Sequence, residues 1–358
     1  MSTKGSTALK GRGATLNLPG RFEKQATEGF DDGWLIEEDP PPPLQTSVTA
    51  EPGKSILIAN RSPDIPFDYS INPYQGCEHG CIYCYARPSH AFRNLSPGLD
   101  FETRLFYKPN AAELLLAELG RPGYKPGLIN LGSNTDPYQP IEQKLGITRQ
   151  ILEVLWRCKH PVSLITKGSL VLRDLDLLAK MAAEKLASVY VSLTTLDPDL
   201  KRTLEPRAAS AGARLRVMRT LTDAGVAVGV NVSPMIPFIN DHELEHILEA
   251  AKAAGAVRAS TIFVRLPNEV SPLFQAWLEA HFPDRKERVM SAIRSAHGGR
   301  DYKPEWGTRF RGTGPIAQVL RGRFEVACKR LGLPTGERIP LDASRFVRPV
   351  AGGQLSLL

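Results

Sequence analysis

The chain has 358 residues, of which 42% are hydrophobic and 23% are charged, and its formal net charge is +7. This composition is ordinary for a globular protein, and no run of about 18 apolar residues is present to form a membrane-spanning helix. The N-terminal sequence lacks the apolar core of a signal peptide, so we expect a cytoplasmic protein, where clustered cysteines more often bind metal than form disulfides. The basic charge is compatible with a polyanionic partner such as nucleic acid but does not indicate one by itself.

Residues 1–50 are predicted to form a disordered N-terminal extension. Glycine, threonine and charged residues dominate it, and Pro40–Pro43 form a stiff polyproline segment near its end. Lys10, Arg12 and Arg21 lie among glycines that would let the backbone approach a partner, but a disordered basic arm is the simpler interpretation.

Residues 51–270 show short apolar runs that alternate with amphipathic helical stretches, at intervals of about 30–35 residues, the length of a βαβ unit. The predicted strands are 67–72, 127–132, 161–166, 188–195, 226–234 and 258–266, and predicted helices include 148–159, 173–185, 213–225 and 241–255. Such units wind into a parallel sheet. We therefore predict an α/β fold, a partial (β/α)6 TIM-like barrel, with a doubly wound sheet as the alternative.

Residues 271–348 are predicted to form a mainly helical, basic C-terminal region, followed by a flexible tail over 349–358. Between 285 and 330 there are twelve Lys or Arg residues and four acidic ones. Aromatic and basic residues alternate within 301–314, at Tyr302, Lys303, Trp306, Arg309, Phe310 and Arg311. This mixture suits phosphate contact and base stacking, although an amphipathic lid with a solvated basic face explains it equally well.

Three of the five cysteines, Cys77, Cys81 and Cys84, lie in one loop rich in glycine and tyrosine. A structural zinc site would need a fourth ligand, which His79 or His90 could supply as a Cys₃His set. The spacing C-x₃-C-x₂-C on a single loop instead suits a [4Fe–4S] cluster with one iron left for a substrate or cofactor. A nucleic-acid-binding protein with a structural cluster or a Cys₃His zinc remains the alternative.

The stretch CEHGCIYC, residues 77–84, resembles the signature of the radical S-adenosylmethionine (SAM) superfamily, with Tyr83 in the aromatic position. Four later stretches, 132–142, 165–174, 203–210 and 231–241, are similar to the branch that contains spore photoproduct lyase and is described as DNA-repair-photolyase-like. The resemblance covers residues 55–270. It implies a radical SAM enzyme, with a lyase- or transferase-type reaction, that cleaves SAM reductively to a 5′-deoxyadenosyl radical. It also implies a reductant such as flavodoxin or ferredoxin, and a nucleic acid substrate in DNA repair or modification.

The same resemblance implies where SAM binds, because each charged part of SAM needs a complementary group. The ammonium needs acceptors after the second strand of the superfamily, where Ser133, Asn134, Thr135 and Asp136 follow an apolar run. The carboxylate needs a cation, which Lys167 would supply as a point charge. Taken singly, Asp136 also suits an ordinary turn, and Lys167 also suits a solvated loop.

The ribose and adenine of SAM are assigned in the same way. Ser192 and Thr194 alternate with apolar residues, so they lie on the same face of their strand and would bind the ribose hydroxyls. Arg207 would contact the SAM carboxylate or a substrate, and adenine would lie near the backbone around Tyr83. Cys158 is interpreted as a small buried hydrophobe, as is Cys328.

The sequence departs from spore photoproduct lyase between Cys84 and Cys158, where that enzyme has a cysteine that returns a hydrogen atom and this chain has none. Tyr83, Tyr85 and Tyr138 are alternative relays, and the sequence selects none of them. Gln354–Leu358, QLSLL, resembles the short peptides by which bacterial DNA enzymes bind the sliding clamp, and a frayed terminus is the alternative interpretation.

Overall fold

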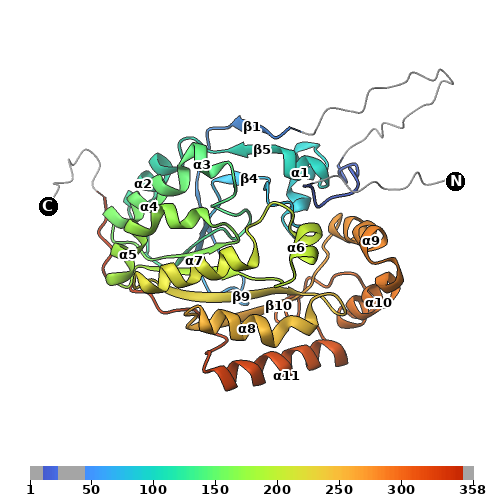
Figure 1. Ribbon diagram of the computed structural model, residues 1–358. Coiled ribbons are helices and arrows are strands. Elements are labelled where there is room, and N and C mark those ends of the chain that lie inside the picture. The colour runs from blue at the N-terminus through green and yellow to red at the C-terminus, as the bar shows by residue number, and fades with distance from the viewer. Residues whose placement is uncertain (1–10, 23–44, 350–358) are drawn as a thin grey trace, which may run out of the picture.

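The computed structural model describes residues 11–22 and 45–349. The strands of its central sheet are β2 (Leu57–Ala59), β3 (Tyr69–Ile71), β6 (Ile129–Leu131), β7 (Val162–Thr166), β8 (Ala187–Ser192), β9 (Ala227–Met235) and β10 (Arg258–Phe263). Their order is β10-β9-β8-β7-β6-β3-β2 (Figure 1). Every neighbouring pair is parallel except β2 and β3. Six parallel strands thus confirm the predicted α/β fold and partial barrel.

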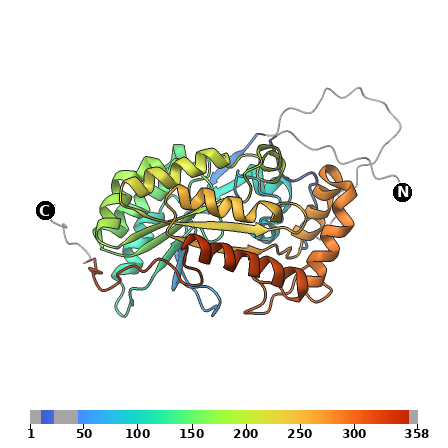
Figure 2. The ribbon, with the colours of Figure 1, turned by 60° about the horizontal axis from the view of Figure 1, so that its bottom comes forward.

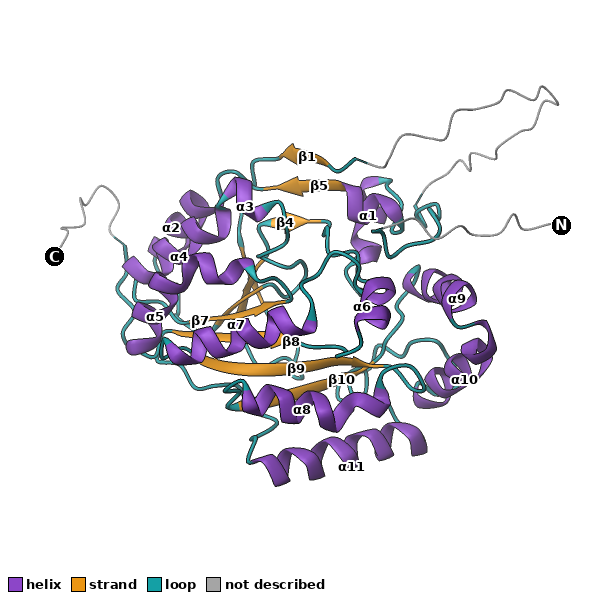
Figure 3. Cartoon of the chain, in the orientation of Figure 1, coloured by secondary structure: helices purple, strands orange, loops and turns teal. Residues whose placement is uncertain are grey.

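Helices cover the outer face of this sheet (Figure 3). Between the strands run α4 (Ile147–Arg157), α5 (Leu175–Ala183), α6 (Pro198–Leu204), α7 (Ala211–Asp223) and α8 (Leu244–Ala253). The hydroxyl of Ser210 caps α7 by accepting from the backbone N–H of Ala213, and the carboxylate of Asp197 caps α6 through Asp199. These caps fix the loops that leave β8 and α6, which contribute to the site described below.

A second, three-stranded sheet was not predicted. It pairs β1 (Ser47–Ala50), β5 (Arg104–Tyr107) and β4 (Tyr74–Gln75). Close to it lie η1 (Arg87–Arg93), α1 (Leu99–Thr103), α2 (Ala111–Gly120) and α3 (Glu142–Leu145). Because β4 directly precedes the cysteine-rich loop, this small sheet supports one side of that loop.

The predicted N-terminal extension is partly folded. Ser47–Ala50 form β1, and residues 11–22 pack on the core with Gly13, Ala14 and Gly20 buried. The physical reason is a buried carboxylate, that of Glu102, which accepts hydrogen bonds from the backbone N–H groups of Gly13 and Ala14. Pro40–Pro43 and Lys10 lie outside the described residues.

The C-terminal region is helical, as predicted. It consists of α9 (Val270–His281), η4 (Pro283–Arg285), α10 (Lys286–Ala296) and α11 (Gly314–Leu331), and α11 runs alongside α8 (Figure 2). Residues 332–349 then run along the sheet toward the end of α4. There the N–H of Val347 donates to the carbonyl of Cys158. The tail with Gln354–Leu358 lies outside the described residues, and none of the helices described is long and apolar enough to span a membrane.

Candidate active site

The cysteine loop, residues 76–86, is folded closely into the core. Cys77 and Cys81 are buried and Cys84 is half-buried. The N–H of Cys77 donates to the carbonyl of Phe101 at 2.9 Å, and the N–H of Cys84 donates to that of Cys81 at 3.2 Å. Gly80 has φ +67°, and a Cβ there would lie 2.9 Å from the Glu102 carboxylate. A glycine is therefore needed for the loop to turn at this position.

A buried ion pair holds the loop from beneath. Arg87 and Glu102 are both fully buried, and the guanidinium nitrogen of Arg87 lies 2.5 Å from the carboxylate oxygen. Arg87 also donates to the carbonyl oxygens of Gly80 at 3.2 Å and Cys81 at 2.9 Å. Arg87 thus gives the Gly80 carbonyl a donor and the Cys81 carbonyl a second donor in a buried position, and so fixes the loop.

The donor set of this loop fits an iron–sulfur cluster. Burial, Asp136 and the neighbouring Cys81 and Cys84 raise the pKa of Cys77, and burial raises the pKa of Cys81 to about 12. Cys77 and Cys81 therefore need a nearby cation to become thiolates, which the iron of a bound cluster would supply.

The two histidines considered for zinc have other partners. His79 Nδ1 lies 3.3 Å from Asp136 Oδ2, and His90 Nε2 lies 2.9 Å from the carbonyl oxygen of Arg104. Within residues 11–22 and 45–349, no three His, Cys, Asp or Glu side chains are arranged to hold a single metal ion. Three thiols on one loop, with Nδ1 of His79 and Nε2 of His90 bonded to other residues, fit a cluster with one iron open better than a Cys₃His zinc.

The loop after β6 lies against the segment that leads into the cysteine loop. Asn72 accepts at its side-chain oxygen from the N–H of Asn134 at 2.9 Å and donates to the hydroxyl of Ser133 at 3.2 Å. The hydroxyl of Thr135 donates to the carbonyl of Tyr74 at 2.9 Å. Three of the predicted ammonium-binding residues are thus held beside the cysteine loop.

Asp136 joins three loops. Its carboxylate accepts from Thr166 Oγ1 at 2.7 Å and from the N–H of Lys167 at 2.6 Å, both at the end of β7, and it contacts His79 of the cysteine loop. Burial raises the pKa of Asp136, but His79 and these donors outweigh burial and lower it to about 2. Asp136 is therefore ionised and is engaged in fixing the loops; its contact with the ammonium of SAM stays a prediction.

Glu205 is a buried carboxylate at the candidate site that the sequence reasoning did not single out. It is fully buried between α6 and α7, and its carboxylate forms an ion pair with the buried Arg214. The hydroxyls of Tyr83 and Thr194 also contact it, and Lys167 Nζ lies 3.9 Å away. Burial raises the pKa of Glu205, but Arg214 and Lys167 outweigh burial and lower it to about 2. Three of the predicted SAM-binding residues therefore meet at a carboxylate that was not assigned a role.

The remaining predicted residues lie around this centre. Ser192 is buried at the end of β8, and its carbonyl accepts from Arg214 at 2.9 Å. Arg207 lies on the outer side of the cysteine loop, where it donates to the Glu78 carboxylate at 3.1 Å and its backbone N–H donates to the carbonyl of His79. Arg207 does not contact Lys167 or Glu205, so the candidate residues surround the loop from two sides.

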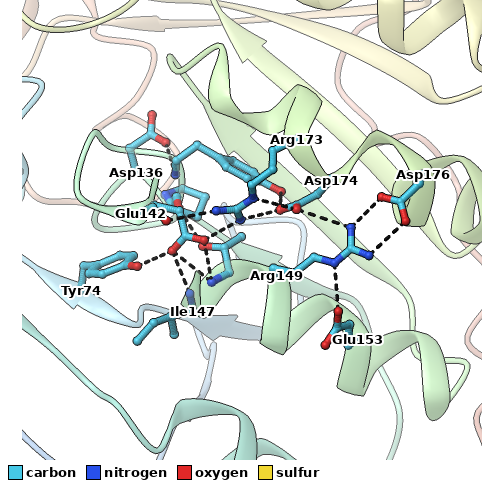
Figure 4. Close-up of polar contacts among 12 residues, drawn as sticks. Tyr74, Asp136, Glu142, Ile147, Arg149, Glu153, Arg173, Asp174 and Asp176 are labelled. Carbon is cyan, nitrogen blue, oxygen red and sulfur yellow. Dashed lines mark hydrogen bonds and ion pairs between the residues drawn. The ribbon is translucent and has the colours of Figure 1, made fainter. Parts of the chain in front are cut away.

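A second buried network supports the loop after β6 (Figure 4). Glu142 accepts from the hydroxyl of Tyr74 and from Arg173 at 2.6 Å, and it also accepts from the N–H groups of Ile147 and Thr148. The hydroxyl of Tyr138 donates to Asp174 at 3.0 Å, and Arg173 bridges Asp174 to Glu142. The Tyr138 hydroxyl is thus part of the support.

The family of the chain follows from comparison with known proteins. A model of the radical SAM superfamily matches residues 71–251, which span the cysteine loop and all the strands from β4 to β9. The chain belongs to the radical SAM superfamily. It is therefore an enzyme, and this family implies a [4Fe–4S] cluster and SAM as cofactors.

Similar proteins support this placement. An uncharacterized protein of Mycobacterium tuberculosis is 36% identical over 232 residues, which are 64% of this chain and 68% of that protein. The radical SAM Nalpha-GlyT isomerase of Pseudomonas phage M6 is 25% identical over 224 residues, 62% of this chain and 44% of its own. The structure of spore photoproduct lyase complexed with dinucleoside spore photoproduct has the same fold, with a TM-score of 0.58, 14% identity and 80% coverage of both chains.

Proposed function

We propose that this radical SAM enzyme holds its [4Fe–4S] cluster on Cys77, Cys81 and Cys84 and acts on a nucleic acid. The observation that carries the cluster assignment is the donor set, three thiols on one loop with His79 held by Asp136. When bound, the cluster supplies the electron that cleaves SAM and so provides the radical.

The proposed role of this chain's residues is to bind and orient SAM beside that loop. Lys167 would meet the SAM carboxylate, because its side chain is 17% exposed and its Nζ lies 3.9 Å from Glu205, which contacts the cysteine loop. Ser133 and Asn134 would offer oxygens to the ammonium, and Ser192 and Thr194 would face the ribose. Asp136 would act by fixing the loop of Ser133, since its own oxygens already have donors.

A stack of aromatic and guanidinium groups beside the cysteine loop supports a nucleic acid substrate. It begins at Tyr85, the residue after Cys84, which is 43% exposed. The guanidinium carbon of Arg265 lies 4.1 Å from the ring centroid of Tyr85 and 4.8 Å from that of Phe310. Arg309 continues the stack at 4.6 Å from the Phe310 ring. Alternating rings and guanidinium planes are the surface on which nucleobases stack.

The charge of this stack is available to an anion. Among the residues that the structure describes, Arg265 has no carboxylate within ion-pair distance, whereas Arg309 is paired with Asp64 at 2.6 Å. An arginine that contacts ring faces with its guanidinium can still offer N–H groups to a phosphate. Spore photoproduct lyase, which has the same fold, binds a dinucleoside. A base stacked beside Tyr85 with its phosphate on Arg265 would lie next to the radical site.

The cluster assignment is tested by the iron content of single cysteine variants. We expect Cys77→Ala, Cys81→Ala and Cys84→Ala each to lose most of the iron and the 5′-deoxyadenosine that the reduced wild type forms from SAM. Cys328→Ala is the matched control, because Cys328 is buried on α11 and should leave the iron unchanged. A cluster-loaded wild type that forms no 5′-deoxyadenosine would contradict the proposal.

The substrate class is tested by fluorescence anisotropy with a labelled single-stranded oligonucleotide. We expect Arg265→Ala to weaken binding about tenfold, as for loss of one stacking partner. Arg330→Ala removes the same charge from a surface ion pair between Arg330 on α11 and Glu249 on α8. This variant should weaken oligonucleotide binding much less. Equal losses in the two variants would mean that general charge, and not the stack, binds the strand.

A further inference from the structure

A short N-terminal segment, residues 11–22, crosses the outside of the cysteine loop, and we call it the N-terminal strap. It passes beside α1 in Figure 1 and is separated by more than fifty residues of sequence from the loop that it covers. Its backbone is buried where it meets the loop, at Gly13 and Ala14. The family match begins only at residue 71, so it does not include the strap.

The strap touches the loop at Gly80, between Cys77 and Cys81. A Cβ built on Gly13 would overlap the carbonyl oxygen of Gly80, so the two backbones are in direct contact. Only glycine permits this approach. The contact lies one residue from Cys81, and any shift of the loop that carries Cys81 therefore moves the surface on which the strap rests.

A chain of buried polar contacts joins the strap to the same loop. The N–H groups of Gly13 and Ala14 donate to the Glu102 carboxylate at 3.1 Å and 2.9 Å. Glu102 is ion-paired with Arg87, which donates to the carbonyls of Gly80 and Cys81. The strap and the loop thus both bond to one buried ion pair, and a strap that left would take two N–H donors from the Glu102 carboxylate.

The other end of the strap is held at two further points. A Cβ on Gly98 would overlap the carbonyl oxygen of Leu16, and the N–H of Leu99 donates to the side chain of Asn17 at 3.0 Å. Arg21 forms an ion pair with Glu269 at 2.8 Å, immediately before α9. The strap therefore joins the cysteine loop to the C-terminal helical region.

We propose that the N-terminal strap and the cluster stabilise each other: cluster binding holds the strap down, and the docked strap retards loss of the cluster. This inference rests on the proposed cluster ligands. A cluster on Cys77 and Cys81 restricts the intervening Gly80, which is the surface that Gly13 contacts. Coupling between two such events is reciprocal, so a strap that cannot dock must weaken retention of the cluster. A docked strap also keeps water from the loop.

The first test uses hydrogen exchange in the wild-type chain with and without its cluster, prepared anaerobically. We expect cluster loading to slow exchange of the strap peptide that contains Gly13 and Ala14 by roughly fivefold or more, the low end of typical coupling. A peptide within α11, far from the loop, is the internal control and should not change. Iron measured in the same samples separates a failure of the cluster assignment from a failure of the strap inference. Absence of iron would overturn the cluster assignment and the strap inference together, whereas normal iron with unchanged strap exchange would overturn the strap inference alone.

The second test measures how fast a chelator removes iron from two variants that block docking at different points, Gly13→Ala and Gly98→Ala. Both place a Cβ on backbone of the partner segment. We expect the decay of the cluster's visible absorption to be roughly fivefold faster in each. Gly322→Ala is the control, because a Cβ there meets no atom within 4 Å. Decay at the wild-type rate in Gly13→Ala, with the strap shown to be released by its fast exchange, would refute the inference.

Discussion

Glu205→Gln is the substitution that most directly examines the buried centre of the site. The Glu205 carboxylate is fully buried and faces Arg214, whose side chain is also almost completely buried, as well as Lys167. Glutamine preserves the shape and can still meet the hydroxyls of Tyr83 and Thr194. The change therefore removes the charge and the acceptor that faces Arg214, because an amide nitrogen cannot accept a hydrogen bond.

The expected cost follows from the pKa of Glu205. The pKa of Glu205 falls from 4.5 in the unfolded chain to about 2 in the folded protein. Because each pKa unit corresponds to about 1.4 kcal/mol, the folded state stabilises the carboxylate by about 3 kcal/mol. Removing one partner of a buried ion pair generally costs about 3–5 kcal/mol, because the remaining charge is left buried. The two values agree, so we expect Glu205→Gln to lower the free energy of unfolding by about 3 kcal/mol.

Urea unfolding of the cluster-free protein at pH 7, followed by circular dichroism, measures this change. The control is Glu153→Gln, a half-exposed surface partner of Arg149 (Figure 4), which should cost less than about 1 kcal/mol. Because the folded pKa of Glu205 lies below its unfolded value, the stabilisation is present above about pH 4.5 and is lost as the pH falls toward 2. The difference between wild type and Glu205→Gln should shrink over that range. If Glu205→Gln and Glu153→Gln lowered the free energy of unfolding equally at pH 7, the argument that the buried ion pair stabilises the site would be refuted.

Three further outcomes are expected. Lys167→Met should weaken SAM binding by about tenfold or more in equilibrium dialysis, as for loss of one charge-assisted contact, with the iron content unchanged. Gly168→Ala should destabilise the fold by about 1–3 kcal/mol, because its Cβ would lie 2.5 Å from the carbonyl oxygen of Tyr138, whereas Gly322→Ala in α11 should be neutral or stabilising. Deletion of 354–358 should abolish binding to purified sliding clamp in surface plasmon resonance, and an intact chain that does not bind would dismiss that partner.

The central sheet could be predicted because parallel strands covered on both faces leave continuous apolar runs. Every residue of β8 is buried, and the sequence shows this as a run of β-forming residues. The small sheet of β1, β4 and β5 left no such signal. Its strands have two to four residues and are partly exposed, and β1 pairs with β5 across more than fifty residues of sequence, from Ser47 to Arg104. Short edge strands of this kind are defined by their partners and not by their own sequence.

The candidate site was also predictable from the sequence only in part. The cysteine positions follow from spacing along one loop, so they were visible in the sequence. The role of Glu205 depends on Arg214, which lies in the next helix and reads there as part of an ordinary amphipathic pattern. Similarly, the composition of residues 11–22 predicts disorder. The group that orders them, the Glu102 carboxylate, lies 88 residues after Ala14, so the local sequence does not show it. Buried charges that meet only in the folded chain leave no periodic signal.

The three buried carboxylates of the site act on the same loop from different sides. Glu102 holds its carbonyls through Arg87, Asp136 contacts it at His79, and Glu205 contacts it at Tyr83. Each carboxylate is contributed by a different loop or short helix, and each is already paired within the protein. Because these carboxylates already have partners within the protein, we expect them to position the loop and not to bind iron. In the proposed site these paired carboxylates would position the loop, and the cysteines and the neighbouring Lys167 would be the groups that bind the cluster and SAM.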